Sequence, residues 1–240
     1  IWVSANTVCG ISLHLLSSVI LARLLVPSDF GVMAIVMAII ALTQGTLTAG
    51  FESALIQKQK KPEAFLNTAW TLDLIRCVIL FLIVFIAAPL VGVYFDEPKT
   101  TQVLRVMSVF FIFQGLRNIG VVYFRKNLEF HKQCILETLP LLVDVCVAIP
   151  LAYILKSYWA LVWSKLAMTS AACLLSYAMH PYRPRFEFDL KKIKNLFNFG
   201  RWILFSSLIV MLREQGVNMF VGKLFGIFFL GLYERATVFS

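Results

Sequence analysis

Charged side chains fall in the middle of long apolar stretches of this sequence, and their types predict an anion-binding cavity. Three of them are basic, Arg117, Lys165 and Arg213, and the acidic residues Asp144 and Glu214 lie at similar depth. A charge at the centre of a membrane helix costs about 3 kcal/mol even on a lenient insertion scale, so we expect these residues to face water. Cationic groups in such a cavity suit a phosphate or pyrophosphate group, whose charge must be compensated before it leaves bulk solvent.

A second interpretation is that these charges pair with one another and fix the packing of the helices. Arg76, also a candidate for the cavity, lies three residues after Asp73, which is the spacing of an ion pair within one helix. For Arg76 the pairing interpretation is favoured. For the deeper Arg117, Lys165 and Arg213 we favour the cavity, in which an arginine is a bidentate clamp and a lysine is a point charge.

His14 is the candidate for coupling transport to an ion. It lies in the middle of the first apolar stretch, and at an offset of 200 residues its counterpart is Glu214. Because both side chains titrate, coupling to H⁺ is one prediction, and Na⁺ is an alternative ion. A lone histidine in a membrane helix is also often an interhelical hydrogen-bond donor, and this second interpretation stays open.

The sequence offers little for an enzyme or a cofactor site. It contains no nucleophile–base constellation, glycine-rich phosphate loop or metal-ligand spacing, and the segments between apolar stretches are short. The five cysteines all lie in apolar stretches, and their odd number and spacing indicate small apolar fillers rather than disulfides or metal ligands. We expect no enzyme activity, no cofactor and no metal.

The composition identifies the elements that hold these charges as membrane helices. The chain is 60% apolar and 15% charged, whereas soluble domains are about half apolar and about a quarter charged. About 20 apolar residues cross about 30 Å of hydrocarbon. The pattern predicts an all-α polytopic helical bundle with seven spans and the start of an eighth, at 1–22, 31–54, 68–94, 102–124, 134–155, 158–179, 202–222 and 229 onward.

The basic residues between the spans predict the orientation of the bundle. Eleven of them follow even-numbered spans, whereas four follow odd-numbered ones, namely Arg23, Lys99, Lys156 and Lys223. The positive-inside rule therefore places the N-terminus in the cytoplasm. The net charge of +9 is distributed over these short segments, so we do not expect a nucleic acid partner.

The chain divides into three parts. Residues 1–180 form a first lobe of six spans, residues 181–199 a cytoplasmic linker, and residues 200–240 the start of a second lobe. Within the linker an apolar stripe alternates with lysines, which predicts an amphipathic helix on anionic membrane lipids. Residues 22–32 and 222–232 match at the offset of 200, with Gly31 opposite Gly231, and six spans per lobe make this repeat parallel. Because the sequence ends within a helical pattern, we expect a fragment.

An ordered set of short motifs resembles the polysaccharide-transporter family, which includes the Wzx-type flippases of O-antigen and colanic acid. The motifs cover essentially the whole chain: LARLLVPSDFG (21–31), ALIQK (54–58), FRKNLEF (124–130), WALV (159–162), RPR (183–185), FG (199–200), GKLFG (222–226) and LGLYERA (230–236). The segment before Trp159 departs from the family, which often has a glycine-rich turn there. The family shares a superfamily with multidrug exporters and the lipid II flippase.

The resemblance implies twelve or more helices in two lobes around a central cationic cavity. It also implies alternating access that moves undecaprenyl-pyrophosphate-linked repeat units to the outer leaflet of a bacterial-type inner membrane, for O-antigen or exopolysaccharide biosynthesis, with a polysaccharide polymerase as a further partner. Two alternatives remain. An ion-coupled multidrug-type exporter of the same fold would have a cavity lined mainly by carboxylates, and a membrane-embedded glycosyl- or acyltransferase would need a catalytic loop.

Overall fold

The computed structural model describes residues 2–45, 63–188, 209, 215–233, 235 and 236. The described residues form helices and connecting turns, with no strand among them. Among the described residues, six helices are long and apolar enough to cross a membrane, and the number is seven if one bent pair of helices is counted as a single span. The predicted all-α polytopic membrane bundle is therefore confirmed. The predicted amphipathic helix of the linker, Arg213 and Glu214 all lie outside the described residues.

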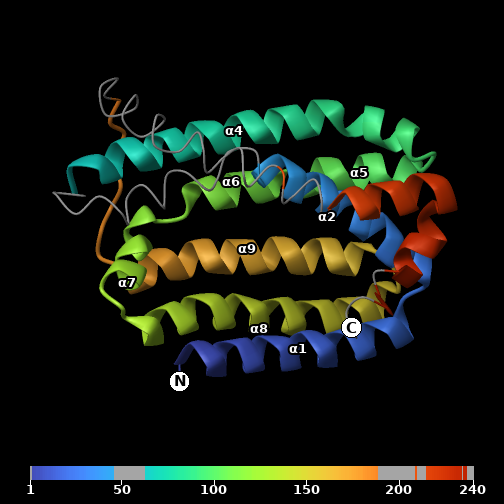
Figure 1. Ribbon diagram of the computed structural model, residues 1–240, viewed down its shortest axis with the longest axis horizontal. Coiled ribbons are helices and arrows are strands. Elements are labelled where there is room, and N and C mark those ends of the chain that lie inside the picture. The colour runs from blue at the N-terminus through green and yellow to red at the C-terminus, as the bar shows by residue number, and fades with distance from the viewer. Residues whose placement is uncertain (1, 46–62, 189–208, 210–214, 234, 237–240) are drawn as a thin grey trace.

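The described residues up to 180, which fall in the predicted first lobe, form five long helices and one broken span. The long helices are α1 (Trp2–Leu24), α2 (Pro27–Gly45), α4 (Glu63–Tyr94), α8 (Phe130–Leu155) and α9 (Trp159–Met179). Figure 1 shows α1, α8 and α9 in a row, with α6 beyond α9 and α4 on the far side. Consistent with a lipid-facing surface, α4 leaves Ile86, Leu90 and Val93 more than 70% exposed.

The turns that join these helices have clear local causes. Proline occupies the first position of α2 and of α5 (Pro98–Met107), where its missing N–H leaves no helical bond unmade. The turn between α8 and α9 has no glycine, although the family often has one there. Lys156 itself adopts the left-handed conformation at φ 46°, and its N–H donates to the carbonyl oxygen of Ala152.

The fourth span differs from the continuous helix expected at 102–124. It consists of α5, α6 (Val109–Leu116), the 3₁₀ turn η1 (Ile119–Val121) and α7 (Val122–Lys126). The direction changes by 64° between the stretches Pro98–Leu116 and Ile119–Lys126. The cause is local, because Asn118 leaves the helix and its side chain accepts the N–H of Gly120 at 2.9 Å.

Asn118 also fixes the segment that leaves the first lobe. Its buried side chain donates to the carbonyl oxygen of Tyr182 at 2.7 Å, and its N–H donates to Ser176 Oγ of α9 at 3.0 Å. The Tyr182 hydroxyl bonds Asn67 Oδ1 on α4. Burial, together with the charge of Lys132, lowers the pKa of His180, and its ring Nδ1 accepts the Tyr182 N–H at 3.1 Å. The described linker residues 181–188 thus lie against the first lobe.

The described residues 215–233, 235 and 236 fall in the predicted second lobe and are called the second-lobe segment. This segment is also more continuous than expected. The sequence predicts a turn between spans ending at 222 and starting at 229, whereas residues Gln215–Tyr233 are helical throughout. The predicted turn is reduced to a kink, because Gly226 adopts a left-handed φ of 82°. The red ribbon changes direction along this segment (Figure 1).

Asn118→Ala is expected to destabilise the folded protein by about 2 kcal/mol, because the Gly120 N–H and the Tyr182 carbonyl lose a buried partner. Thermal unfolding in detergent and limited proteolysis at 181–188 measure the loss. The control is Asn127→Ala, at an exposed asparagine of the turn before α8. Equal stability of the two variants would contradict this role of Asn118.

Candidate functional site

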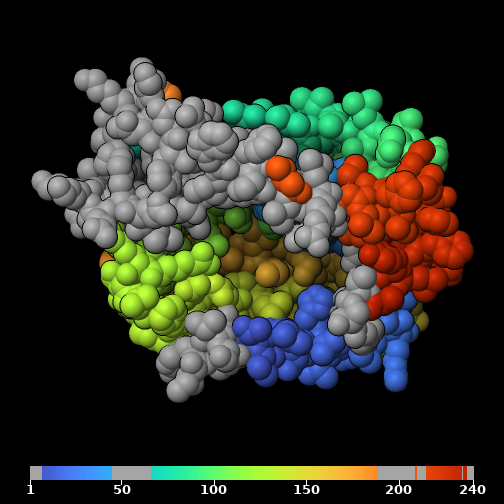
Figure 2. All heavy atoms as spheres, viewed as in Figure 1, coloured from blue at the N-terminus to red at the C-terminus, as the bar shows by residue number. Residues whose placement is uncertain are grey.

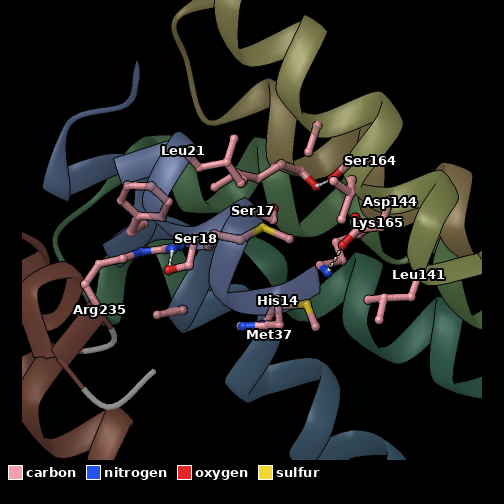
Figure 3. A pocket seen from close by; sticks show the side chains of 16 residues that line it. His14, Ser17, Ser18, Leu21, Met37, Leu141, Asp144, Ser164, Lys165 and Arg235 are labelled. Carbon is pink, nitrogen blue, oxygen red and sulfur yellow. Dashed lines mark hydrogen bonds and ion pairs between the residues drawn. The ribbon is translucent and has the colours of Figure 1, made fainter. Parts of the chain in front are cut away.

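A cavity of about 290 Å³ lies between α1, α2, α8, α9 and the second-lobe segment. Its position follows from the packing: α1 packs on α8 and α2 packs on α5, but α1 and α2 do not pack extensively on each other. Figure 2 shows the surface hollowed between α1 in blue and the second-lobe segment in red. Polar and charged side chains from four elements line the cavity (Figure 3), namely His14, Ser17, Ser18, Asp144, Ser164, Lys165 and Arg235.

The centre of this site is an ion pair between two neighbouring helices. Lys165 Nζ on α9 lies 2.6 Å from Asp144 Oδ2 on α8. Asp144 is 8% exposed, and its other oxygen, Oδ1, makes no hydrogen bond with the described residues. The lysine side chain keeps 28% exposure on the cavity side. Removal of one partner from a buried ion pair strongly destabilises a protein, because the other charge is left without a counter-ion. At the edge of a cavity, water or a ligand can replace the lost partner.

Arg235 brings a second cation to the cavity from the second-lobe segment. Its Nη1 donates to Ser18 Oγ on α1 at 2.8 Å, and its guanidinium carbon lies 3.4 Å from the ring centroid of Phe30 on α2. These contacts are a hydrogen bond and a cation–π interaction. Arg235 is not among the site residues predicted from the sequence. The available signal was its place within the predicted eighth span, but the sequence does not reveal that it reaches α1.

His14 lies on the α1 wall, close to the Lys165–Asp144 pair (Figure 3). The charges of Lys165, Arg235 and Asp144 all act on its imidazole. The structure therefore brings three of the predicted residues, His14, Asp144 and Lys165, into one site.

The remaining predicted residues lie elsewhere. Arg76 is 7% exposed and its Nη2 lies 2.6 Å from Asp73 Oδ1 within α4, and it does not line the cavity. Arg117 caps the end of α6 and lines a separate pocket of about 50 Å³ with Arg125, Gln133 and Glu137. The predicted set is therefore divided between a cavity, an intrahelical pair and the break in the fourth span.

The charges of the cavity favour an anionic ligand. Among the described lining residues, Lys165 and Arg235 are cationic and Asp144 is the carboxylate. The arginine guanidinium can donate two parallel hydrogen bonds to the oxygens of one phosphate. The lysine ammonium is a point charge that can pair with whichever anion lies nearest. The described residues hold no cluster of three or more His, Cys, Asp or Glu side chains suited to a metal.

Comparison with known proteins gives a family match and several distant relatives. A family model described as polysaccharide biosynthesis protein matches residues 20–240. The teichuronic acid biosynthesis protein TuaB of Bacillus subtilis is 23% identical over 98% of this chain and 49% of its own length. The lipopolysaccharide biosynthesis protein WzxC of Escherichia coli is 23% identical over 98% and 48%, respectively. The succinoglycan biosynthesis transport protein ExoT of Rhizobium meliloti is 24% identical over 92% and 45%.

The chain thus spans about half the length of the curated relatives it matches. No solved structure matches it.

The ion pair predicts an asymmetric response to mutation. Lys165→Met leaves the buried Asp144 carboxylate without a counter-ion and is expected to lower the free energy of unfolding by about 3 kcal/mol. The double variant Asp144→Asn/Lys165→Met removes both charges and is expected to regain most of that loss. Unfolding of the purified proteins in detergent completes the double-mutant cycle. Additive effects of the two changes would contradict the pair.

Proposed function

The chain belongs to the family of polysaccharide biosynthesis proteins, and from this membership we propose that the protein moves lipid-linked oligosaccharides across a membrane. The transported unit is an oligosaccharide on undecaprenyl pyrophosphate, carried from the cytoplasmic to the outer leaflet by alternating access for polysaccharide biosynthesis. A relative that covers most of this chain is named as a transport protein for succinoglycan biosynthesis.

The observation that carries this proposal is a cavity within an apolar helical bundle whose described lining includes two cations, Lys165 and Arg235, and one buried carboxylate, Asp144. A pyrophosphate needs such compensation when it leaves water, while its polyprenyl chain remains in lipid.

The proposed binding step is an exchange of counter-ions. The pyrophosphate replaces the Asp144 carboxylate beside Lys165 Nζ, where the ion pair now measures 2.6 Å. The Arg235 guanidinium donates to two oxygens of the other phosphate group. Ser17 and Ser18 on α1 supply neutral hydrogen-bonding groups. Asp144, released from Lys165, faces His14 across the cavity. His14 is accordingly the group through which a proton enters the cycle.

We propose that the end of the bundle with the N-terminus faces the cytoplasm of a bacterial-type plasma membrane. The turns after α1, α4 and α8 meet at the opposite end (Figure 1). Basic residues are fewer in the segments after odd-numbered spans, which supports an outer location for these turns.

A second candidate function is export of a cation by the same fold. The specific observation in its favour is Asp144, whose oxygen Oδ1 makes no hydrogen bond with the described residues and borders the cavity. In an exporter of cations the carboxylate binds the ligand and Lys165 competes with it. In the flippase, Lys165 binds the substrate and Asp144 competes with the substrate for it. In the cation exporter, Asp144 binds the substrate and Lys165 is the competitor.

Charge neutralisation separates these roles. In the lipid-linked oligosaccharide flippase, Lys165→Gln is expected to lower transport by at least about tenfold, since a charge-assisted bond contributes about 1.5–3 kcal/mol. Asp144→Asn is expected to retain transport, because the lysine stays charged. The control is Arg105→Gln, at an exposed arginine that does not line the cavity. The reverse ranking of the Lys165 and Asp144 variants would favour the cation exporter.

Reconstitution tests the transported substrate itself. The intact protein in proteoliposomes is expected to expose a fluorescent undecaprenyl-pyrophosphate oligosaccharide to an impermeant quencher faster than protein-free liposomes do. The matched control is undecaprenyl phosphate without sugar, whose smaller charge and missing glycan fit the cavity less well. Equal rates with and without protein would refute the flippase proposal.

A further inference from the structure

The backbones of α2 and the second-lobe segment come into direct contact, and the Ile227 side chain packs at the same point. A β-carbon added to Gly31 would overlap the carbonyl oxygen of Ile227, and one added to Gly231 would overlap the carbonyl oxygen of Pro27. Both overlaps fall inside the 3.0 Å within which β-carbons essentially never approach another atom. Only glycine at both positions permits this approach, as in small-residue crossings of membrane helices.

The contact is reciprocal in a way that a chance crossing is not. At the repeat offset of 200 residues, Gly31 corresponds to Gly231 and Pro27 corresponds to Ile227. Gly31 meets Ile227, and Gly231 meets Pro27. The two contacts are therefore equivalent, because the offset exchanges Gly31 with Gly231 and Pro27 with Ile227. Contacts related by a two-fold axis show this pattern. The β-carbon position of Gly231 also lies 3.0 Å from the backbone nitrogen of Gly31.

This crossing lies beside the cavity. Phe30, next to Gly31, is 4% exposed and lines the cavity, as does Arg235, which lies one helical turn after Gly231. Arg235 in turn bridges Ser18 of α1 and the Phe30 ring. Beyond the crossing, Lys223 Nζ lies 3.2 Å from Asp96 Oδ2 in the turn after α4. The second-lobe segment thus contacts α1, α2 and the α4–α5 turn at the same end of the bundle.

We propose that Gly31 and Gly231 form a two-fold symmetric gate at this end of the cavity. The gate is closed in the present structure, and the two helices separate when the cavity opens to the side of the membrane that bears Lys223. Glycine is required because the gate closes backbone against backbone. This inference goes beyond the proposed function, which concerns what is carried and not how either end of the cavity is sealed.

A gate and a permanent crossing respond differently to a bulkier residue at the glycine positions. In a permanent crossing a bulkier residue destabilises the protein without exposing the cavity. In a gate the bulkier residue prevents closure, so the cavity becomes accessible from one side of the membrane. Only accessibility separates the two, because both predict some loss of stability.

The test measures the rate at which a thiol in the cavity reacts. The intact protein carries Ser17→Cys after replacement of its native cysteines, and a membrane-impermeant maleimide is added on the side where Lys223→Cys reacts. Either Gly31→Ala or Gly231→Ala is expected to raise the labelling rate of Ser17→Cys at least tenfold. The controls are Gly216→Ala, where an added β-carbon has no neighbour within 4 Å, and Gly10→Ala, where the nearest atom is 3.9 Å away. Both controls should leave the rate unchanged.

A cross-link supplies the complementary test, since it leaves both glycines in place. Asp96→Cys and Lys223→Cys are exposed and can be joined by a short bifunctional methanethiosulfonate reagent that reduction reverses. The linked protein is expected to keep Ser17→Cys unlabelled. In a linked protein that retains Ser17, transport is expected to be lost, and reduction should restore it. Full transport by the linked protein, or unchanged labelling in both glycine variants that insert normally, would overturn the gate. Because labelling requires no substrate, its outcome is independent of whether the flippase proposal holds.

Discussion

The structure depends on how a helical bundle in hydrocarbon holds charged side chains. A cation at bilayer depth must have a counter-ion or water, because lipid offers neither. Arg76 takes the first solution and pairs with Asp73 in a buried position on α4. Lys165 takes both, since it pairs with Asp144 and also faces the cavity. The same electrostatic requirement thus produces a structural pair in one helix and a candidate binding site between two others.

The cavity lies where α1 and α2, although consecutive in the chain, do not pack extensively on each other. The α1 helix lies on α8, and α8 lies on α9, whereas α2 lies on α5. The space left between α1 and α2 receives Arg235 from a segment about 200 residues away in the sequence. A site assembled in this way changes when either neighbour moves, which is the property that a transporter needs and that a rigid core lacks.

Much of the fold could be predicted from the sequence, because an apolar stretch of about 20 residues has few alternatives to a membrane helix. Asp144 and Lys165 were selected because charged side chains avoid lipid, but the sequence did not show that they line one cavity with His14 and without Arg76 and Arg117. The break at Asn118 was missed because an asparagine in an apolar stretch gives no signal until its partners Tyr182 and Ser176 are known. The role of Arg235 was missed for the same reason, since both of its contacts come from distant parts of the chain.

Arg235 lines the cavity and lies one helical turn after Gly231, so it belongs both to the proposed binding site and to the proposed gate. At the predicted offset of 200 residues, Ile35 corresponds to Arg235. In the closed structure its guanidinium is held by Ser18 and the Phe30 ring. An anionic headgroup competes for the same guanidinium, and a ligand shifts a conformational equilibrium only through such a difference in contacts. Binding of the headgroup therefore weakens the bridge that joins α1 and α2 to the second lobe, which links occupancy of the cavity to opening of the gate.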